Sequence, residues 1–309
     1  MRLKDSARMS FVASMMMAAA CWGVGGVMTK RALAEMQPLT LLVIQLTVSV
    51  LFLWAVVAIQ RSRFPSRQEI FQLGLIGLLN PGFAYTFTLI GLKFTTASVS
   101  ALLWASEPIL ILGLAVLILR ERLTPPLIVC SLLAISGVAL VAGLNVGTGN
   151  ASALLGVAII LAGVACCALY TVFTRRLTTT LDPVLLIALQ QTVALAWALV
   201  IWPIEATQTE TAAPTTIGGW GWAIVSGLVY YALAFWFFIN GLKRATASLA
   251  GFFLNLIPIF GLTAAAMILG ERLSSMQWVG AVLILIAAAG LWRWQNTEAV
   301  TAEISAKAA

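Results

Sequence analysis

Residues 91–109 read GLKFTTASVSALLWASEPI, and residues 241–259 read GLKRATASLAGFFLNLIPI. Between 91–124 and 241–274, which align at an offset of 150, 15 of 34 positions are identical. Upstream, the similarity continues at an offset of 145, where Gln45 matches Gln190. The chain is therefore built from two related halves, and the five-residue difference falls in the polar loop at 205–216.

The composition is that of an integral membrane protein. Of the 309 residues, 61% are hydrophobic and only 9% are charged, whereas soluble domains carry about 25% charged residues. The net charge of +7 does not indicate nucleic-acid binding, because the basic residues are spread over short loops and form no clustered surface. The four cysteines lie in apolar runs and histidine is absent, so the sequence predicts neither a metal site nor a cofactor.

Ten apolar runs are long enough to cross a bilayer, which takes about 20 residues in a helix. Their approximate ends are 10–32, 38–59, 69–92, 95–119, 125–144, 153–175, 183–204, 217–241, 245–269 and 275–294. The runs are continuous rather than alternating, which excludes a β-barrel. With the N-terminus inside, 14 of the 18 basic residues face the cytoplasm, so the positive-inside rule predicts an N-in, C-in topology.

These runs predict an all-α polytopic protein made of two five-helix repeats. The first repeat covers 10–144, the second covers 153–294, and 295–309 form a polar cytoplasmic tail. Because five is odd, the second repeat must enter the membrane from the opposite side. Inverted repeats are typical of secondary transporters, in which two halves rock about a shared site at mid-membrane.

Glu107 is the strongest candidate for function, because it lies near the centre of the fourth apolar run. A charge at that depth costs about 3 kcal/mol or more. It would serve as a counter-ion for a substrate amine or as a proton carrier. The structural alternative is a protonated carboxyl bonded to a hydroxyl group or to a carbonyl freed by Pro108. The second repeat has Ile257 at this position, so the fold itself does not require an acid.

Several other polar and aromatic residues lie at mid-depth, where a cavity for an amphipathic ligand or bonding between helices would satisfy them. Including Glu107, the predicted substrate-binding residues are Trp22, Asn80, Tyr85, Trp104, Glu107, Tyr170, Tyr231 and Asn255.

Prolines mark the positions where the apolar helices are expected to bend or break. The predicted gating or kink positions are Pro81, Pro108 and Pro258. The run Asn80-Pro81-Gly82 predicts a break in the middle of the third span. Simple helix bending is the alternative for Pro108 and Pro258. Glu121 and Glu271, at two helix ends, are expected to pair locally or to cap the helix that follows.

The doubled arrangement resembles the drug/metabolite transporter superfamily, and within it the EamA-type ten-helix branch. The resemblance covers about residues 10–294 and rests on the Trp22-Gly23 start, the GLK and TAS junctions, the two helical prolines, and the RERL and GERL helix ends. The chain also looks like the YddG-type amino-acid exporters of that branch. This implies a multi-pass protein of the bacterial inner membrane with a central cavity formed by the first, third, fourth, sixth, eighth and ninth helices.

The resemblance implies export of aromatic and other neutral amino acids by alternating access. The expected partners are this small-molecule substrate and the lipid bilayer, with no nucleic acid and no obligate protein partner. Export of organic cations or drug-like compounds is the alternative, with Glu107 facing the positive charge. A membrane enzyme is disfavoured because no nucleophile–base pair is visible, and a channel does not need an internal inverted repeat.

Overall fold

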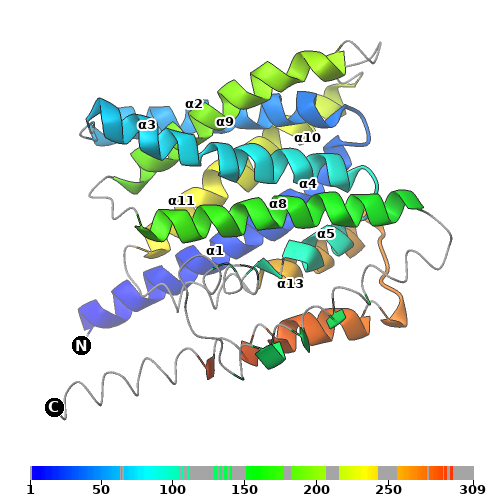
Figure 1. Cartoon of the computed structure of the whole chain (residues 1–309). Coiled ribbons are helices and arrows are strands. Elements are labelled where there is room, and N and C mark those ends of the chain that lie inside the picture. Colours follow the sequence, from blue (N-terminus) through cyan, green and yellow to red (C-terminus); the bar gives the residue numbers. More distant parts are fainter. Residues whose placement is uncertain are drawn as a thin grey trace.

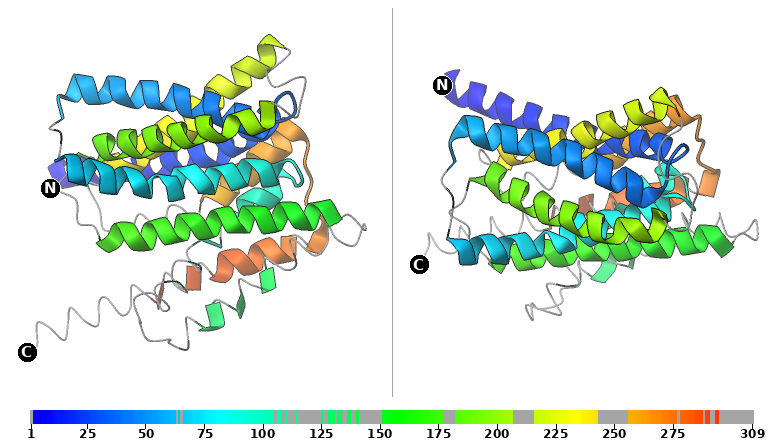
Figure 2. Two further views of the ribbon diagram at one scale, coloured as in Figure 1. Left: turned by 45° about the horizontal axis from the view of Figure 1, so that its top comes forward. Right: turned by 90° about the horizontal axis from the view of Figure 1, so that it is seen from above.

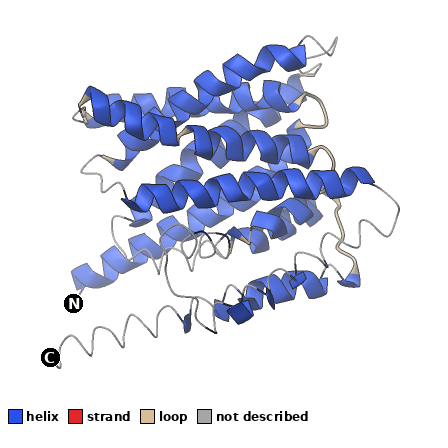
Figure 3. Cartoon of the chain, in the orientation of Figure 1, coloured by secondary structure: helices blue, strands red, loops and turns tan. Residues whose placement is uncertain are grey.

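The structure is a computed structural model, and the regular elements among the residues it describes are all helices, with no strand (Figure 3). It describes 2–104 except 63 and 65, scattered positions from 106 to 140, and 151–176, 182–206, 216–242 and 256–294 except 277, 288, 291 and 292. Figures 1 and 2 show the longer helices lying side by side along roughly one direction.

The first half of the chain begins with two long helices and continues with a helix interrupted by a π-helical segment. Its described elements are α1 (Arg2–Ala32), α2 (Pro38–Gln60), α3 (Arg67–Ile76), η1 (Leu78–Phe83), α4 (Ala84–Leu92) and α5 (Ala97–Trp104). The second half contributes α8 (Ala151–Arg176), α9 (Pro183–Ala206), α10 (Ile217–Ser226), η2 (Gly227–Leu233), α11 (Ala234–Leu242), α13 (Ile257–Ala264) and η3 (Ala265–Leu269).

The bounds of these elements recur from one half to the other. At an offset of 150, the bounds of α3 and α4 become those of α10 and α11, and a π-helical segment lies between the two helices in both cases. At an offset of 145, the start of α2 becomes the start of α9, and both helices begin with a proline. Proline suits the first helical position, where its missing N–H has no partner in the helix.

Five of the described helices are long and apolar enough to span a membrane. They cover Pro38–Gln60, Arg67–Leu92, Ser152–Tyr170, Val184–Glu205 and Ile217–Phe238, with shorter apolar helices at Ile259–Leu269 and Trp278–Ala287. Many large apolar side chains point outward, including Leu51 and Val200. The described part of the chain is therefore a polytopic membrane protein.

Counterpart helices α2 and α9 pack against each other in opposite directions. Near the middle of both, the Ser49 hydroxyl of α2 donates to Gln191 of α9 at 2.5 Å. The start of α2 contacts the end of α9, where the Thr40 backbone N–H donates to Glu205 at 3.0 Å. Beyond the end of α2, the Ser62 hydroxyl donates to Asp182 at 2.6 Å. The two helices are therefore antiparallel along their whole length.

Two glycines let the halves approach at the level of the backbone. A Cβ atom on Gly77 would lie 2.5 Å from the carbonyl oxygen of Gln190. A Cβ atom on Gly227 would lie 2.8 Å from the carbonyl oxygen of Gln45. Both distances are too short for a carbon, so only glycine fits at either position. The two contacts are counterparts, because the glycines match at the offset of 150 and the glutamines match at the offset of 145.

The third apolar run is broken where the sequence predicts. Asn80 has φ −147° and ψ 120°, which is extended backbone inside a helical segment, and Pro81 follows it. Asn80, Pro81 and Gly82 are all buried. Irregular backbone at membrane depth is tolerated where it faces protein or a cavity, and the broken segment faces α8 and α9.

Candidate functional site

Three aromatic side chains, from α5 and η2, gather around Tyr85 of α4. Its ring centroid lies 4.7 Å from that of Tyr231, 5.4 Å from Tyr230 and 6.1 Å from Trp104 of α5. Tyr230 and Tyr231 are neighbours on η2, with ring centroids 5.3 Å apart. We call these four residues the aromatic cluster. Two of its members come from each half of the chain.

A thiol joins Asn80 to the acidic group that the sequence singles out. Cys167 of α8 donates a hydrogen bond to Glu107 with a distance of 3.2 Å, and it accepts one from the Asn80 amide, also at 3.2 Å. Glu107 lies within electrostatic range of Tyr85 and Tyr230. The sequence predicts that four of these residues share one site. The structure places them close together: Asn80, Tyr85, Trp104 and Glu107.

Several buried polar atoms in this region have no hydrogen-bond partner among the described residues. They are the Asn80 Oδ1, Trp104 Nε1, Gln190 Nε2 and Tyr231 hydroxyl atoms. Leaving such an atom unpaired costs about 1–3 kcal/mol, so buried polar groups normally find partners. One acceptor and three donors thus remain available in this region to a ligand that offers both kinds of group.

Two predicted residues lie at the edges of this arrangement. Tyr170 of α8 donates its hydroxyl to Gln190 at 3.0 Å, one turn from Cys167. Trp22 of α1 packs edge-on against Phe235 and Phe238 of α11, with centroids 5.2 and 5.3 Å away. Among the described residues, its ring contacts are therefore with α11 rather than with the aromatic cluster.

Of the four remaining predicted positions, two lie in the described part of the chain and two do not. Pro81 is buried within η1. Pro258 lies in the first turn of α13, where a proline suits the start of a helix. Asn255 and Pro108 lie outside the described residues.

Three residues of the site were not predicted from sequence. Tyr230 belongs to the aromatic cluster, Cys167 links Asn80 to Glu107, and Gln190 leaves its amide nitrogen unpaired within the described structure. One signal for Cys167 was available, because it occupies the position of Trp22 in the other repeat. The small side chain leaves room for Glu107 to approach.

Carboxylates at the helix ends cap helices that are distant in sequence. Glu271 accepts hydrogen bonds from the backbone N–H groups of Ala97 and Ser98, at 3.0 and 2.9 Å. Glu205 does the same for Leu39 and Thr40 at the start of α2. The prediction that Glu271 pairs locally or caps the following helix is therefore wrong. The first N–H groups of any helix lack partners within it, and the tertiary fold brings α5, not the next helix, beside this carboxylate.

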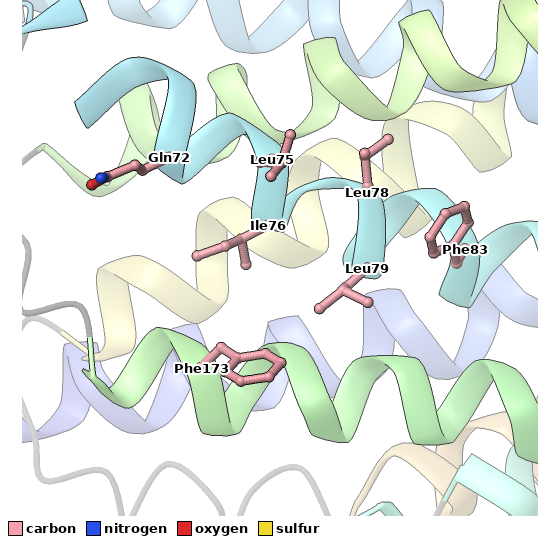
Figure 4. Close-up of a pocket in the computed structure, with 7 residues that line it drawn as sticks. All are labelled: Gln72, Leu75, Ile76, Leu78, Leu79, Phe83 and Phe173. Carbon is pink, nitrogen blue, oxygen red and sulfur yellow. The ribbon is translucent and has the colours of Figure 1, made fainter. Parts of the chain in front are cut away.

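A separate pocket of about 590 Å³ lies beside the break in the third apolar run. Its lining residues are Gln72, Leu75, Ile76, Leu78, Leu79, Phe83 and Phe173, from α3, η1 and α8 (Figure 4). Leu75 is 53% exposed and Phe173 is 38% exposed. None of the aromatic cluster lines this pocket, so it is an apolar groove on the outside of the helices rather than the predicted central site.

The arrangement at the aromatic cluster suits binding rather than bond making. Aromatic rings pack against apolar groups and attract cations, while Glu107 supplies an acceptor. Within the described residues, no group of three or more histidine, cysteine or acidic side chains is placed to hold a metal ion.

A helical membrane fold with a polar and aromatic site in its interior is typical of a membrane transporter, and comparisons with known proteins agree. The model of the EamA-like transporter family matches residues 9–143 and again 154–293. The chain therefore belongs to the EamA-like transporter family.

Individual relatives are also described as transporters. The uncharacterized transporter YetK of Bacillus subtilis (strain 168) is 26% identical over 248 residues, which cover 78% of this chain and 73% of that protein. An uncharacterized transporter of Archaeoglobus fulgidus is 22% identical over 86% of this chain and 92% of its own. One solved crystal structure superposes with a TM-score of 0.63 at 16% identity, covering 90% of this chain and 95% of its own. This last likeness concerns the fold alone.

Proposed function

We propose that the protein is a secondary transporter of the bacterial inner membrane that exports small amphipathic metabolites, with aromatic and other neutral amino acids as substrates. The observation that carries this proposal is the aromatic cluster beside Glu107, surrounded by buried polar atoms without partners among the described residues. A zwitterion with an apolar side chain offers the matching groups.

Each part of such a substrate has a counterpart in the site. The four rings pack against the apolar side chain, and Glu107 and the Asn80 Oδ1 atom accept hydrogen bonds from the ammonium group. The Trp104 Nε1 and Tyr231 hydroxyl groups donate to the carboxylate. Binding then replaces unsatisfied buried groups with hydrogen bonds, which favours the loaded state.

Transport by this site proceeds through alternating access between two inverted five-helix halves. Three observations support the inversion: the recurring element bounds, the antiparallel packing of the counterpart helices α2 and α9, and the paired glycine contacts at Gly77 and Gly227. Counterpart helices of an inverted repeat must run in opposite directions, whereas those of a parallel repeat do not.

Export of organic cations is the second candidate, favoured by the position of Glu107 beside several aromatic rings. A quaternary ammonium group needs no hydrogen bond, and it is stabilised by ring faces and a carboxylate alone. Such a substrate would leave the Trp104 and Tyr231 donors unused, which distinguishes the two candidates.

Efflux from proteoliposomes tests both candidates. Vesicles loaded with labelled phenylalanine, tryptophan or a quaternary ammonium dye would be compared for the wild type, Trp104→Ala and Glu107→Gln. We expect Trp104→Ala to slow amino-acid efflux about tenfold or more, because it removes a ring and a donor. Unchanged efflux of every aromatic amino acid in Trp104→Ala would refute the site. Dye efflux lost in Glu107→Gln, without any amino-acid efflux in the wild type, would favour the cation exporter.

A further inference from the structure

The turn between α4 and α5 lies beyond the aromatic cluster, toward one end of the helices. Helix α4 carries Tyr85 near its start and α5 carries Trp104 at its end, so the two helices form a hairpin whose open end holds these rings. Leu92, at the end of α4, is seven residues after Tyr85. Ala97, at the start of α5, is seven residues before Trp104. At 1.5 Å per residue, the turn lies about 10 Å from the site along the helix axes.

Glu271 caps the start of α5 through three hydrogen bonds. Its Oε1 atom accepts from the Ala97 N–H at 3.0 Å, and its Oε2 atom accepts from the Ser98 N–H at 2.9 Å and the Ser98 hydroxyl at 2.6 Å. A carboxylate at this place satisfies N–H groups that lack helical partners and interacts favourably with the helix dipole. Glu271 follows η3, so these three bonds join α5 to the end of a helix from the other half.

Lys30 binds the end of α4 through hydrogen bonds to backbone carbonyl groups. Its ammonium group donates to the Leu92 carbonyl oxygen and to the Thr95 carbonyl oxygen, the latter at 2.6 Å. A cation suits the C-terminal end of a helix for the reason that an anion suits the start. Lys30 stands in the last turn of α1, eight positions beyond Trp22. The turn is thus held from two sides, by α1 and by the segment after η3.

We propose that Lys30 and Glu271 form a gate that keeps the outer end of the site closed. The proposal rests on the alternating access of the proposed function, and the charge distribution places Lys30 on the outer side. For a substrate to leave outward, the turn between α4 and α5 must separate from α1 and from Glu271. That separation breaks every one of these hydrogen bonds.

The sequence repeats these residue types in the other half. At the offsets of 145 and 150, Lys30 corresponds to Arg175, Glu271 to Glu121, and Ala97-Ser98 to Ala247-Ser248. Each counterpart keeps the residue chemistry of its partner: a cation, a carboxylate, and an Ala-Ser pair. The side chains of these counterparts lie outside the described residues.

Labelling of the thiol in the site tests this directly. In full-length protein carrying Cys21→Ala, Cys130→Ala and Cys166→Ala, Cys167 remains as the reporter. A membrane-impermeant, positively charged thiol reagent would be added to the outside of oriented vesicles, and the labelling rate of Cys167 measured by mass spectrometry. We expect Glu271→Gln to raise the rate about tenfold, because the lost carboxylate favours the outward-open state.

The matched control is Glu205→Gln, which removes a carboxylate that caps the start of α2 on the same side. Because α2 and α9 pack together along their length, this change should leave the rate within about twofold of the parent. If Glu271→Gln disturbs folding, Ser98→Ala and Lys30→Gln provide milder tests with the same expected direction. An unchanged rate in the folded Glu271 and Lys30 variants, or equal increases in Glu271→Gln and Glu205→Gln, would overturn the gate. Because the labelling experiment needs no substrate, its result tests the gate independently of the proposed substrate.

Discussion

The two π-helical segments η1 and η2 occupy matching places in the two halves and yet differ in chemistry. Both interrupt a membrane-spanning helix, and both lie beside a glycine contact to the other half, at Gly77 and at Gly227. In η1 the backbone at Asn80 leaves the helical region. In η2 two tyrosines stand at the same depth.

Features shared by η1 and η2 belong to the repeated fold, whereas features found in only one of them are candidates for ligand contact. The glycine contacts and the π-helical geometry are common to both halves, so we assign them to the packing of the repeats. An amide and a broken backbone on one side, against two phenol groups on the other, are not common, and under the proposed function they would contact the substrate. Repeats constrain shape, and their asymmetry supplies specificity.

The largest expected effect comes from the shared feature. Gly77→Ala and Gly227→Ala should each destabilise the protein by about 2–3 kcal/mol, because the added carbon meets backbone atoms that cannot move aside. Thermal unfolding in detergent micelles measures this. Gly221→Ala is the control, since nothing lies within 4 Å of its Cβ position. A large loss in only one of the two variants would show that the two glycine contacts are not equivalent.

Exchanging a residue between the halves should have the next largest effect. Cys167→Trp places in the second half the side chain that stands at position 22 in the first. The indole would fill the space between Asn80 and Glu107, and we expect substrate affinity to fall about tenfold, or about 1.4 kcal/mol. Cys167→Ala should change it less than threefold. Isothermal titration with phenylalanine or tryptophan measures both, and equal affinities in all three proteins would show that this space is not used.

Removing one hydrogen-bond donor while keeping the ring should have a smaller effect. Trp104→Phe eliminates the Nε1 donor, which has no partner among the described residues. We expect amino acids to bind about fivefold more weakly, corresponding to about 1 kcal/mol, while a quaternary ammonium ion binds as before. The two ligands should be titrated in parallel. An equal loss for both would indicate that the change disturbs packing rather than hydrogen bonding.

Tyr231→Phe should have the smallest effect on the empty protein. The Tyr231 side chain is fully buried and its hydroxyl group has no partner in the described part of the chain. Its removal should leave the unfolding temperature unchanged or raise stability by up to about 1 kcal/mol, yet weaken the binding of zwitterions. A clear loss of stability without ligand would reveal a structural role for the hydroxyl group.

Much of the fold follows from local sequence patterns. Five of the ten apolar runs correspond closely to described helices long enough to span a membrane, because helix length in a bilayer is fixed by thickness. The break at Asn80-Pro81-Gly82 is confirmed, since a proline removes a backbone donor wherever it stands in a helix. The count of ten membrane spans and the inversion of the second repeat stay predictions.

The site is harder to predict from the sequence than the fold is. Glu107 is identifiable because an acid in an apolar run is conspicuous, but its partner Cys167 looks like any small apolar residue in α8. The cap that Glu271 places on α5 joins distant parts of the sequence, and no local pattern encodes it. Contacts of this kind depend on which helices the fold places side by side, and that information is spread over the whole chain.

The distant carboxylate caps have a consequence for the order in which the protein is made. Helix α2 receives its cap from Glu205 and α5 receives its cap from Glu271, and both carboxylates belong to the second half of the chain. At about 5–20 residues per second, the ribosome needs roughly 10–35 s to supply the missing group. Until then, the backbone N–H groups of Leu39, Thr40, Ala97 and Ser98 lack these carboxylate partners. The first half is therefore inserted as an unfinished structure, and synthesis of the second half completes it.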